Sequence, residues 1–355
     1  MFRNGTLVHV WRGDVKLDAS GSAVLSADVP IEAGDNHFVA YAFNHDNVKS
    51  MDASVTISGA PSLQRKGTAY VVAIGINQYA AHASGQLNNL SFAEADATAF
   101  SRQFKLKQDA LQEFDSVEVI PLLGANAVRS RIVDALQALA GKVQPEDGVF
   151  LFYAGHGIAS EGHFYLLPQD FDPKAKFSDP HSHTLSDMDL SKLLEPISPS
   201  RSFLIIDACN SGEALGGDKF VPGPMNSTGL AQLAYEKGLY ILAASQGHES
   251  AMESPNLGSG HGYLTYALVE EGLKTLAAAQ AGTVLLRPWF EFASQRVPKL
   301  QSGTEDEAGA TAQKDQGGRG FLIEGNGDVA QEGRQHPKVF YRREPEATPF
   351  IVAKP

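Results

Sequence analysis

The chain has 355 residues, 43% of them hydrophobic and 20% charged, a composition typical of a globular protein with a large buried core. Its 29 Lys and Arg against 41 Asp and Glu give a net charge of −12, which argues against a nucleic-acid partner. No apolar stretch approaches the roughly 18 residues of a membrane-spanning helix, and no signal-peptide core stands at the start. We therefore expect a cytoplasmic protein with no membrane partner.

The chain contains a single cysteine, Cys209. One thiol makes neither an intrachain disulfide nor a thiol-based metal cage, and a free thiol fits a reducing compartment. Cys209 is therefore either a small apolar residue of the core or a reactive group.

Residues 1–58 contain short alternating strands, separated by Gly, Asp and Asn turns. Candidate strands cover residues 6–11, 36–43 and 53–57. The segment has room for about four strands, whereas a complete immunoglobulin-like sandwich needs roughly seven. We predict a partial immunoglobulin-like β domain, an upstream portion before it, and a linker over residues 59–66 that is rich in Gly, Pro and charge.

From residue 67 onward, continuous apolar runs alternate with helical patterns. The predicted strands cover 69–74, 117–120, 148–153, 202–206 and 239–243, and the predicted helices cover 91–107, 126–141, 186–196, 228–237, 261–275 and 287–298. Apolar runs of this kind indicate strands buried on both faces, which is typical of a parallel sheet covered by helices on both sides. Its active site is expected at the carboxyl ends of the strands.

Two further segments are predicted to lack regular packing. Residues 258–262 are glycine-rich but do not follow a strand, so we interpret them as a flexible loop before a helix and not as a phosphate-binding loop. Residues 301–355 become rich in Gly and Gln, which favours a poorly packed C-terminal extension to a domain that covers 67–300.

Two reactive side chains follow two of the predicted strands. The strand at 148–153 leads into Gly-His-Gly around His156, and the strand at 202–206 leads into Asp-Ala-Cys-Asn around Cys209. Parallel strands end at one edge of a sheet, so neighbouring strands would bring imidazole and thiol together. Histidine can take the proton of a thiol and later return it to a leaving group. The pattern predicts Cys209 as a nucleophile and His156 as its base and acid, with the amides of Gly157 and Cys209 as an oxyanion hole.

These motifs resemble the caspase and metacaspase family, Peptidase C14. Tyr-Ala-Gly-His-Gly is followed by Asp-Ala-Cys-Asn-Ser-Gly, and the cysteine comes 53 positions after the histidine. The segments 88–96 and 262–268 are similar to two further landmarks of that family, and the resemblance covers roughly residues 66–300. It implies a caspase-like fold and a cysteine endopeptidase that acts on proteins or peptides.

The resemblance also implies a specificity. In metacaspases, the aspartate two places before the cysteine and one after the first strand line the specificity pocket, and these positions match Asp207 and Asp96. The resemblance thus implies Arg or Lys before the scissile bond, and two carboxylates would indeed pair with a cation. At Asn210 the chain departs from the histidine of many metacaspases, which leaves any calcium dependence open; no cofactor is indicated.

The segment before the caspase-like domain carries a weaker resemblance. Residues 11–14 and 44–47 are similar to the region that precedes the caspase domain in bacterial proteins with WD40 repeats upstream. This implies a bacterial protein with an upstream WD40-type or regulatory domain.

Several residues have simpler alternatives. Asp207 could only hold the turn before the cysteine, and Asp96 could be an ordinary acid on a helix face. Lys219 lies where relatives keep a processing loop and is a candidate for self-cleavage, against a plain surface loop. Residues 179–183, with two histidines and an aspartate, suit a solvated loop better than a metal site.

Two other function classes also stay open. The same fold could serve as a catalytically silent or gated binding module, or as an adaptor with a buried thiol.

Overall fold

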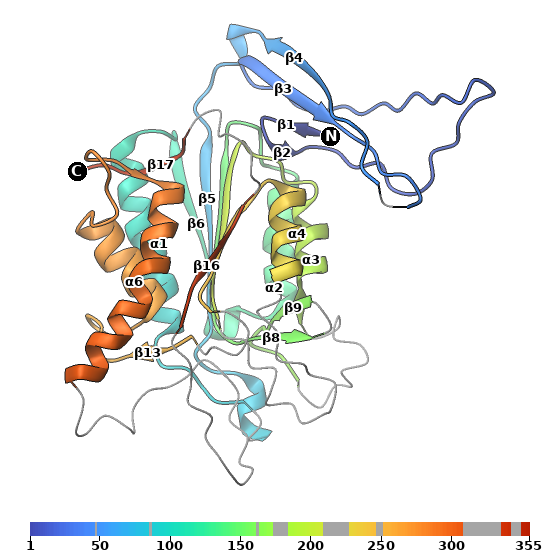
Figure 1. Ribbon diagram of the computed structural model, residues 1–355. Helices are drawn as coiled ribbons and strands as arrows, with labels where there is room; N and C mark the ends of the chain where they lie inside the picture. Colours follow the sequence, from blue (N-terminus) through green and yellow to red (C-terminus); the bar gives the residue numbers. More distant parts are fainter. Residues whose placement is uncertain are drawn as a thin grey trace.

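The computed structural model describes residues 1–46, 48–84, 87–160, 163–172, 184–208, 227–245, 251–307, 335–341 and 349–355. Within these residues a six-stranded sheet forms the centre of the molecule, in the order β16-β12-β11-β7-β5-β6 (Figure 1). Its strands are β5 (Thr68–Gly75), β6 (Ser116–Leu123), β7 (Gly148–Ala154), β11 (Arg201–Asp207), β12 (Tyr240–Ala243) and β16 (Lys338–Phe340). All neighbouring pairs are parallel except β16 with β12, which confirms the predicted mostly parallel sheet.

Helices cover both faces of this sheet (Figure 1). One face carries α1 (Ala93–Leu111), α5 (Tyr263–Thr265), the π-helical segment η6 (Tyr266–Lys274) and α6 (Leu286–Glu307). The other face carries α2 (Arg129–Ala140), α3 (Asp187–Leu194) and α4 (Ser227–Lys237). Each of the six helical patterns predicted from the sequence contains or overlaps one of these elements.

Alternation along β11 explains why the sheet has two cores. Phe203 and Ile205 belong to the core under α1 and α6, whereas Leu204 and Ile206 belong to the core under α2 and α4. Successive strand residues point to opposite faces, so a strand with a continuous apolar run must be covered on both sides. The largest aromatic cluster gathers on the first face, where the ring of Phe203 lies 4.7 Å from that of Phe150.

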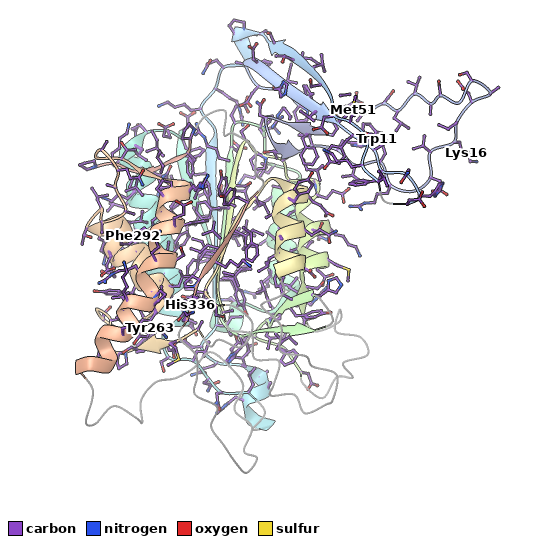
Figure 2. All side chains as sticks on the ribbon, viewed as in Figure 1. Trp11, Lys16, Met51, Tyr263, Phe292 and His336 are labelled. Atoms are coloured by element: carbon purple, nitrogen blue, oxygen red, sulfur yellow. The ribbon has the colours of Figure 1, made fainter. Side chains whose placement is uncertain are left out.

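The N-terminal segment forms a separate antiparallel sheet in the order β2-β1-β3-β4. Its strands are β1 (Phe2–Arg3), β2 (Thr6–Leu7), β3 (Gly34–Ala40) and β4 (Ala53–Gly59). This sheet is compatible with the predicted small β domain, although the strand expected at 6–11 ends at Leu7. Figure 2 shows Trp11, Lys16 and Met51 on this part of the molecule.

The N-terminal sheet packs against the amino ends of the central strands. The fully buried guanidinium of Arg3 donates to the carbonyls of Pro30 and Ser198, and Ser198 lies just before β11. Just before β12, two segments of the chain come so close that a Cβ on Gly238 would lie 2.3 Å from the carbonyl oxygen of Gly5. In Figure 1 this sheet therefore lies at the opposite end of the molecule from β8 (Gly157–Ser160) and β13 (Glu253–Ser254).

The C-terminal part of the chain packs better than the composition suggested. β16 completes one edge of the central sheet, and β17 (Ile351–Ala353) pairs with β15 (Val284–Leu285). Gln335 is buried and donates to the carbonyl of Ala244 at 2.9 Å. The prediction of a poorly packed extension is wrong for these described residues, because strands of three residues give no periodic signal beside a polar, glycine-rich tract.

The remaining described elements are short. They are the strands β9 (His163–Leu166), β10 (Leu185–Ser186) and β14 (His261–Gly262), and the 3₁₀ helices Pro61–Leu63, Ala80–Ser84 and Gly124–Asn126. Among the residues that the structure describes, no helix combines the length and hydrophobicity needed to cross a bilayer.

Replacement of Phe203 by alanine tests the aromatic core. Phe203 is fully buried, so Phe203→Ala should lower the free energy of unfolding by about 3–5 kcal/mol through lost burial and a new cavity. Leu106→Ala on α1 is the matched control, because Leu106 is 60% exposed and its loss should change stability by less than about 0.5 kcal/mol. Urea unfolding of both variants would make this comparison; similar losses would contradict the packing described.

Lys237 should make stability depend on pH. It ends α4, its ammonium donates to the carbonyl of Glu195 at 3.1 Å, and burial lowers its pKa to about 8. Between this value and the ordinary lysine pKa of 10.5, the unfolded chain keeps the proton that the folded chain has lost, so stability rises with pH in that window. Lys237→Met should abolish the rise and increase stability at pH 7 by up to roughly 3 kcal/mol. Unfolding measured from pH 7 to 11, with exposed Lys299→Met as control, would show it; an unchanged slope would count against it.

Candidate active site

Three strands of the central sheet end at the same level. Gly75 of β5 and Asp207 of β11 both align with Ala154, the last residue of β7. One residue further, the amide of Gly155 donates to the carbonyl of Asp207 at 3.3 Å. The predicted adjacency of the two strands is confirmed, and both His156 and Cys209 follow their strands by two residues. Cys209 itself lies outside the described residues, as do Asn210 and Lys219.

The imidazole of His156 is oriented by a main-chain carbonyl. Its Nε2 lies 2.7 Å from the carbonyl oxygen of Asn88, and the residue is fully buried. A carbonyl oxygen only accepts hydrogen bonds, so Nε2 carries a proton, and in the neutral ring Nδ1 is then the basic nitrogen. The ring is therefore held in one tautomer, with a defined nitrogen for proton transfer.

The main chain at His156 is fixed by two tyrosines. The amide of His156 donates to the hydroxyl of Tyr79 at 2.7 Å, and its carbonyl accepts from the hydroxyl of Tyr153 at 2.6 Å. A Cβ on Gly155 would lie 2.7 Å from each of these hydroxyl oxygens. The glycine before the histidine is thus required by packing, and the two tyrosines hold the histidine at the edge of the sheet.

Gly157, predicted to supply one oxyanion-hole amide, is buried at the start of β8. It aligns with Leu166 of the antiparallel strand β9, and the amide of Leu167 donates to the carbonyl of His156 at 3.0 Å. The second predicted donor, the amide of Cys209, lies outside the described residues.

The two predicted pocket acids contact one segment, residues 261–265. Asp207 is fully buried and its Oδ2 accepts from the hydroxyl of Thr265 at 2.6 Å. Asp96, on the first turn of α1, is also fully buried, and its Oδ1 lies 2.8 Å from Nδ1 of His261. Tyr263, between these contacts, lies in Figure 2 toward the end of the molecule where β8 and β13 are found in Figure 1.

The segment before Tyr263 is a hairpin and not a flexible loop. β13 pairs with β14, and Gly260 lies so close to Phe92 that a Cβ would meet the ring at 2.1 Å. The buried carboxylate of Glu253 accepts from the amides of Ser91 and Phe92 at 2.7 and 3.2 Å. The hairpin thus fixes the residues that follow Asn88.

Sequence reasoning missed three of these contributors. Asn88 acts through its main-chain carbonyl, which carries no residue-type signal, and Glu253 lies 162 residues from its partner Ser91. Tyr79, shortly after β5, offered a weak signal as a polar aromatic residue at the site edge of the sheet.

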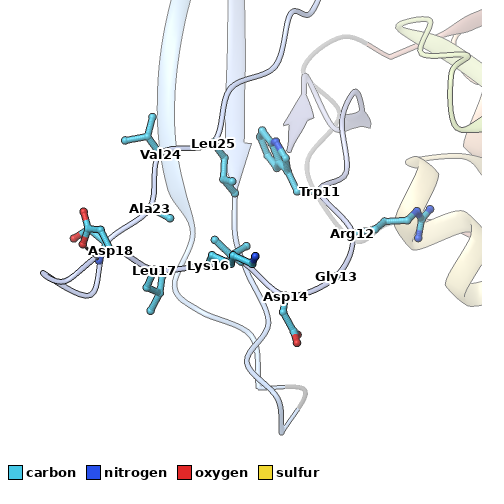
Figure 3. Close-up of a pocket in the computed structure, with 12 residues that line it drawn as sticks. Trp11, Arg12, Gly13, Asp14, Lys16, Leu17, Asp18, Ala23, Val24 and Leu25 are labelled. Carbon is cyan, nitrogen blue, oxygen red and sulfur yellow. Dashed lines mark hydrogen bonds between the residues drawn. The ribbon is translucent and has the colours of Figure 1, made fainter.

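Within the described part of the chain, no group of three His, Cys, Asp or Glu side chains is arranged to hold a metal ion. Residues 179–183, weighed above as a metal site, lie outside it. A hollow of ≈ 540 Å³ lies in the N-terminal segment, lined by residues from Trp11 to Leu25 (Figure 3). It is at the opposite end of the molecule from β8, which begins directly after His156 (Figure 1), so it is not part of this site.

Residues 68–299 match the model of the caspase domain, Peptidase C14, and the chain belongs to this family. A relative is Metacaspase-1 of Eremothecium gossypii, 32% identical over 97 residues, which are 24% of this chain and 20% of that protein. The match thus spans about a fifth of the metacaspase's length. The family supports a protease-type function, and the resemblance inferred from the motifs is confirmed.

Two solved structures are similar at lower identity. Protein GSU0716 from Geobacter sulfurreducens is 17% identical with a TM-score of 0.46, over 74% of this chain and 95% of that one. The Drosophila initiator caspase Dronc is 13% identical with a TM-score of 0.41, over 78% of this chain and 79% of that one.

Removal of one hydroxyl tests how His156 is held. Tyr79→Phe deprives the buried amide of His156 of its acceptor, which should lower the free energy of unfolding by about 1–3 kcal/mol. Tyr240→Phe on β12 is the control. The side chain of Tyr240 is partly exposed, so loss of its hydroxyl should lower the free energy of unfolding by less than about 0.5 kcal/mol. Equal effects of the two changes in urea unfolding would argue against the proposed support.

Proposed function

We propose that this chain is a cysteine endopeptidase in which Cys209 is the nucleophile and His156 the general base and acid. The observation that supports this most is the hydrogen bond from Nε2 of His156 to the carbonyl of Asn88, at the end of the strand beside β11. This bond leaves Nδ1 as the basic nitrogen. A fixed tautomer at the carboxyl end of a parallel sheet is the arrangement that a general base requires.

The proposed reaction is acyl transfer in two steps. Nδ1 of His156 takes the proton of Cys209, and the thiolate attacks the carbonyl carbon of the scissile bond. The amides of Gly157 and Cys209 stabilise the oxyanion, and His156 then gives its proton to the leaving amine. Water, with its proton taken by the same imidazole, attacks the thioester and releases the carboxylic acid and the free thiol.

For specificity, we propose that Asp207 contacts an Arg or Lys side chain before the scissile bond. Asp207 comes two residues before the nucleophile, and a charge-assisted hydrogen bond to a guanidinium or ammonium is the interaction that its carboxylate favours. The hydroxyl of Thr265, 2.6 Å from Oδ2, orients this carboxylate. The Arg or Lys preference also matches Lys219 as a point of self-cleavage.

Burial favours a gated form of this activity as the second candidate. His156, Asp207 and Asp96 each expose none of their surface. A substrate side chain would reach Asp207 only after neighbouring residues move, so we propose that substrate entry requires an opening of the site. The N-terminal sheet does not cover it, because that sheet packs at the opposite ends of the strands.

Turnover of fluorogenic peptides tests the proposal. Peptides ending in Arg or Lys should be cleaved, those ending in Asp should be cleaved at least about 100-fold less efficiently because a buried carboxylate repels them, and Cys209→Ala should abolish cleavage. His156→Ala should lower kcat by about 10²–10⁴-fold.

Two results would contradict parts of the proposal. Undiminished cleavage by Cys209→Ala or His156→Ala would exclude the catalytic pair, whereas a preference for Asp would exclude only the pocket. If no peptide is cleaved, labelling of Cys209 by a peptidyl electrophile separates a gated enzyme, which reacts slowly, from a silent module, which does not react.

A further inference from the structure

The carboxylate of Asp96 already has a resident partner inside the protein. His261 approaches Asp96 Oδ1 at 2.8 Å through Nδ1, and the amide of Gly262 donates to Asp96 Oδ2 at 3.1 Å. Both side chains are buried, that of Asp96 completely. A carboxylate held by two donors in this way has its charge satisfied without any substrate.

His261 itself is fixed from a second side. Its Nε2 lies 3.7 Å from Oε1 of Glu270, and Glu270 in turn accepts from the ammonium of Lys274. The imidazole thus lies between two carboxylates and is confined on β14, which pairs with β13. Turning away from Asp96 to make room for a substrate cation would break these contacts.

The two predicted pocket acids are close in the fold. Gly262 of β14, whose amide contacts Asp96, and Thr265 of α5, whose hydroxyl contacts Asp207, are three residues apart in the chain. Buried carboxylates in the same region repel each other, and a hydrogen-bond donor to one of them reduces that cost. His261 supplies a donor to one of them.

We infer that His261, and not the substrate, is the partner of Asp96, so that His261 acts as a specificity-determining residue that leaves Asp207 as the sole carboxylate for the substrate cation. This inference rests on the proposed peptidase function. The predicted role of Asp96 in contacting substrate is thereby replaced by a positioning role: Asp96 anchors the segment that carries Thr265, and Thr265 orients Asp207.

The test compares two substrates that differ only in charge. Peptides ending in Arg and in citrulline, its neutral analogue of nearly the same shape, are assayed, and the ratio of their kcat/KM values is taken for each variant. This ratio is independent of the fraction of enzyme that is folded, because both substrates meet the same active molecules.

The single variants should differ in a defined way. Asp207→Asn should lower the Arg-to-citrulline ratio about 10- to 100-fold, since a charged hydrogen bond is lost. Asp96→Asn should change the ratio by less than about 3-fold, since the asparagine still accepts from Gly262 and can donate to His261. His261→Asn should also leave the Arg-to-citrulline ratio within about 3-fold of the wild-type value, because the amide nitrogen of the asparagine replaces Nδ1 of the histidine as donor to Asp96.

A double-mutant cycle isolates His261. In His261→Ala, Asp96 loses its imidazole partner but keeps the amide of Gly262, and its carboxylate can then attract the substrate cation, so adding Asp96→Asn in that background should lower the ratio by about 3- to 10-fold. A merely structural role of His261 would leave the ratio insensitive to Asp96 in both backgrounds.

The outcomes separate two failures. A wild-type protein that does not favour Arg over citrulline overturns the proposed preference for a basic side chain, and this inference with it, but leaves the catalytic pair. A wild-type protein that favours Arg, but loses as much of the ratio through Asp96→Asn as through Asp207→Asn, overturns only the inference. Insensitivity of the ratio to Asp96 in the His261→Ala background likewise overturns the role given to His261.

Discussion

The register between β7 and β11 is the constraint on which the site depends. Seven consecutive residue pairs, from Arg201 with Gly148 to Asp207 with Ala154, align the two strands so that both end at the same level. Because these strands are apolar at nearly every position and buried on both faces, two cores hold that alignment. A slip by one residue would move Phe203 and Ile205 to the wrong core. The packing of the sheet therefore fixes the level at which the two strands end, and with it the start of the segments that follow them.

The described site is also connected across the edge of the sheet, from the histidine to the pocket acid. His156 bonds the carbonyl of Asn88, and the residues after Asn88 are held by Glu253 on β13. β13 pairs with β14, whose following turn carries Thr265 to Asp207. The contact of Thr265 with Asp207 is buried and those of His156 and Glu253 are partly buried, and hydrogen bonds shielded from water are costly to lose. The orientation of His156, the proposed base, and that of Asp207, the proposed pocket acid, are thus parts of one hydrogen-bonded arrangement.

How much the sequence predicts depends on how far apart in the chain the interacting residues lie. The strands of the central sheet and the placement of His156 were predictable, because apolar runs and motifs at strand ends are local signals. The supports of the site were not, since Glu253 acts on amides 162 residues away and Asn88 acts through a carbonyl that every residue possesses. Glycine content alone predicts a flexible loop around Gly260, because it does not show that Phe92 fills the space beside this residue. The sequence does not predict β16 either, because its pairing with β12, and not its own composition, makes it a strand.

Buried charged side chains at both ends of the sheet have polar partners, and the kind of partner differs between the two ends. At the amino ends, Arg3 is buried against carbonyl oxygens and Lys237 against the carbonyl of Glu195, and burial lowers the pKa of both side chains. At the carboxyl ends the buried charges are acids, and there the partners are a hydroxyl for Asp207 and an imidazole for Asp96. A hydroxyl is a weaker partner for a carboxylate than a cation is, so of the two acids Asp207 gains more from an incoming guanidinium. The difference between these two neighbours, more than the number of acids, is the basis of the proposed preference for a single positive charge.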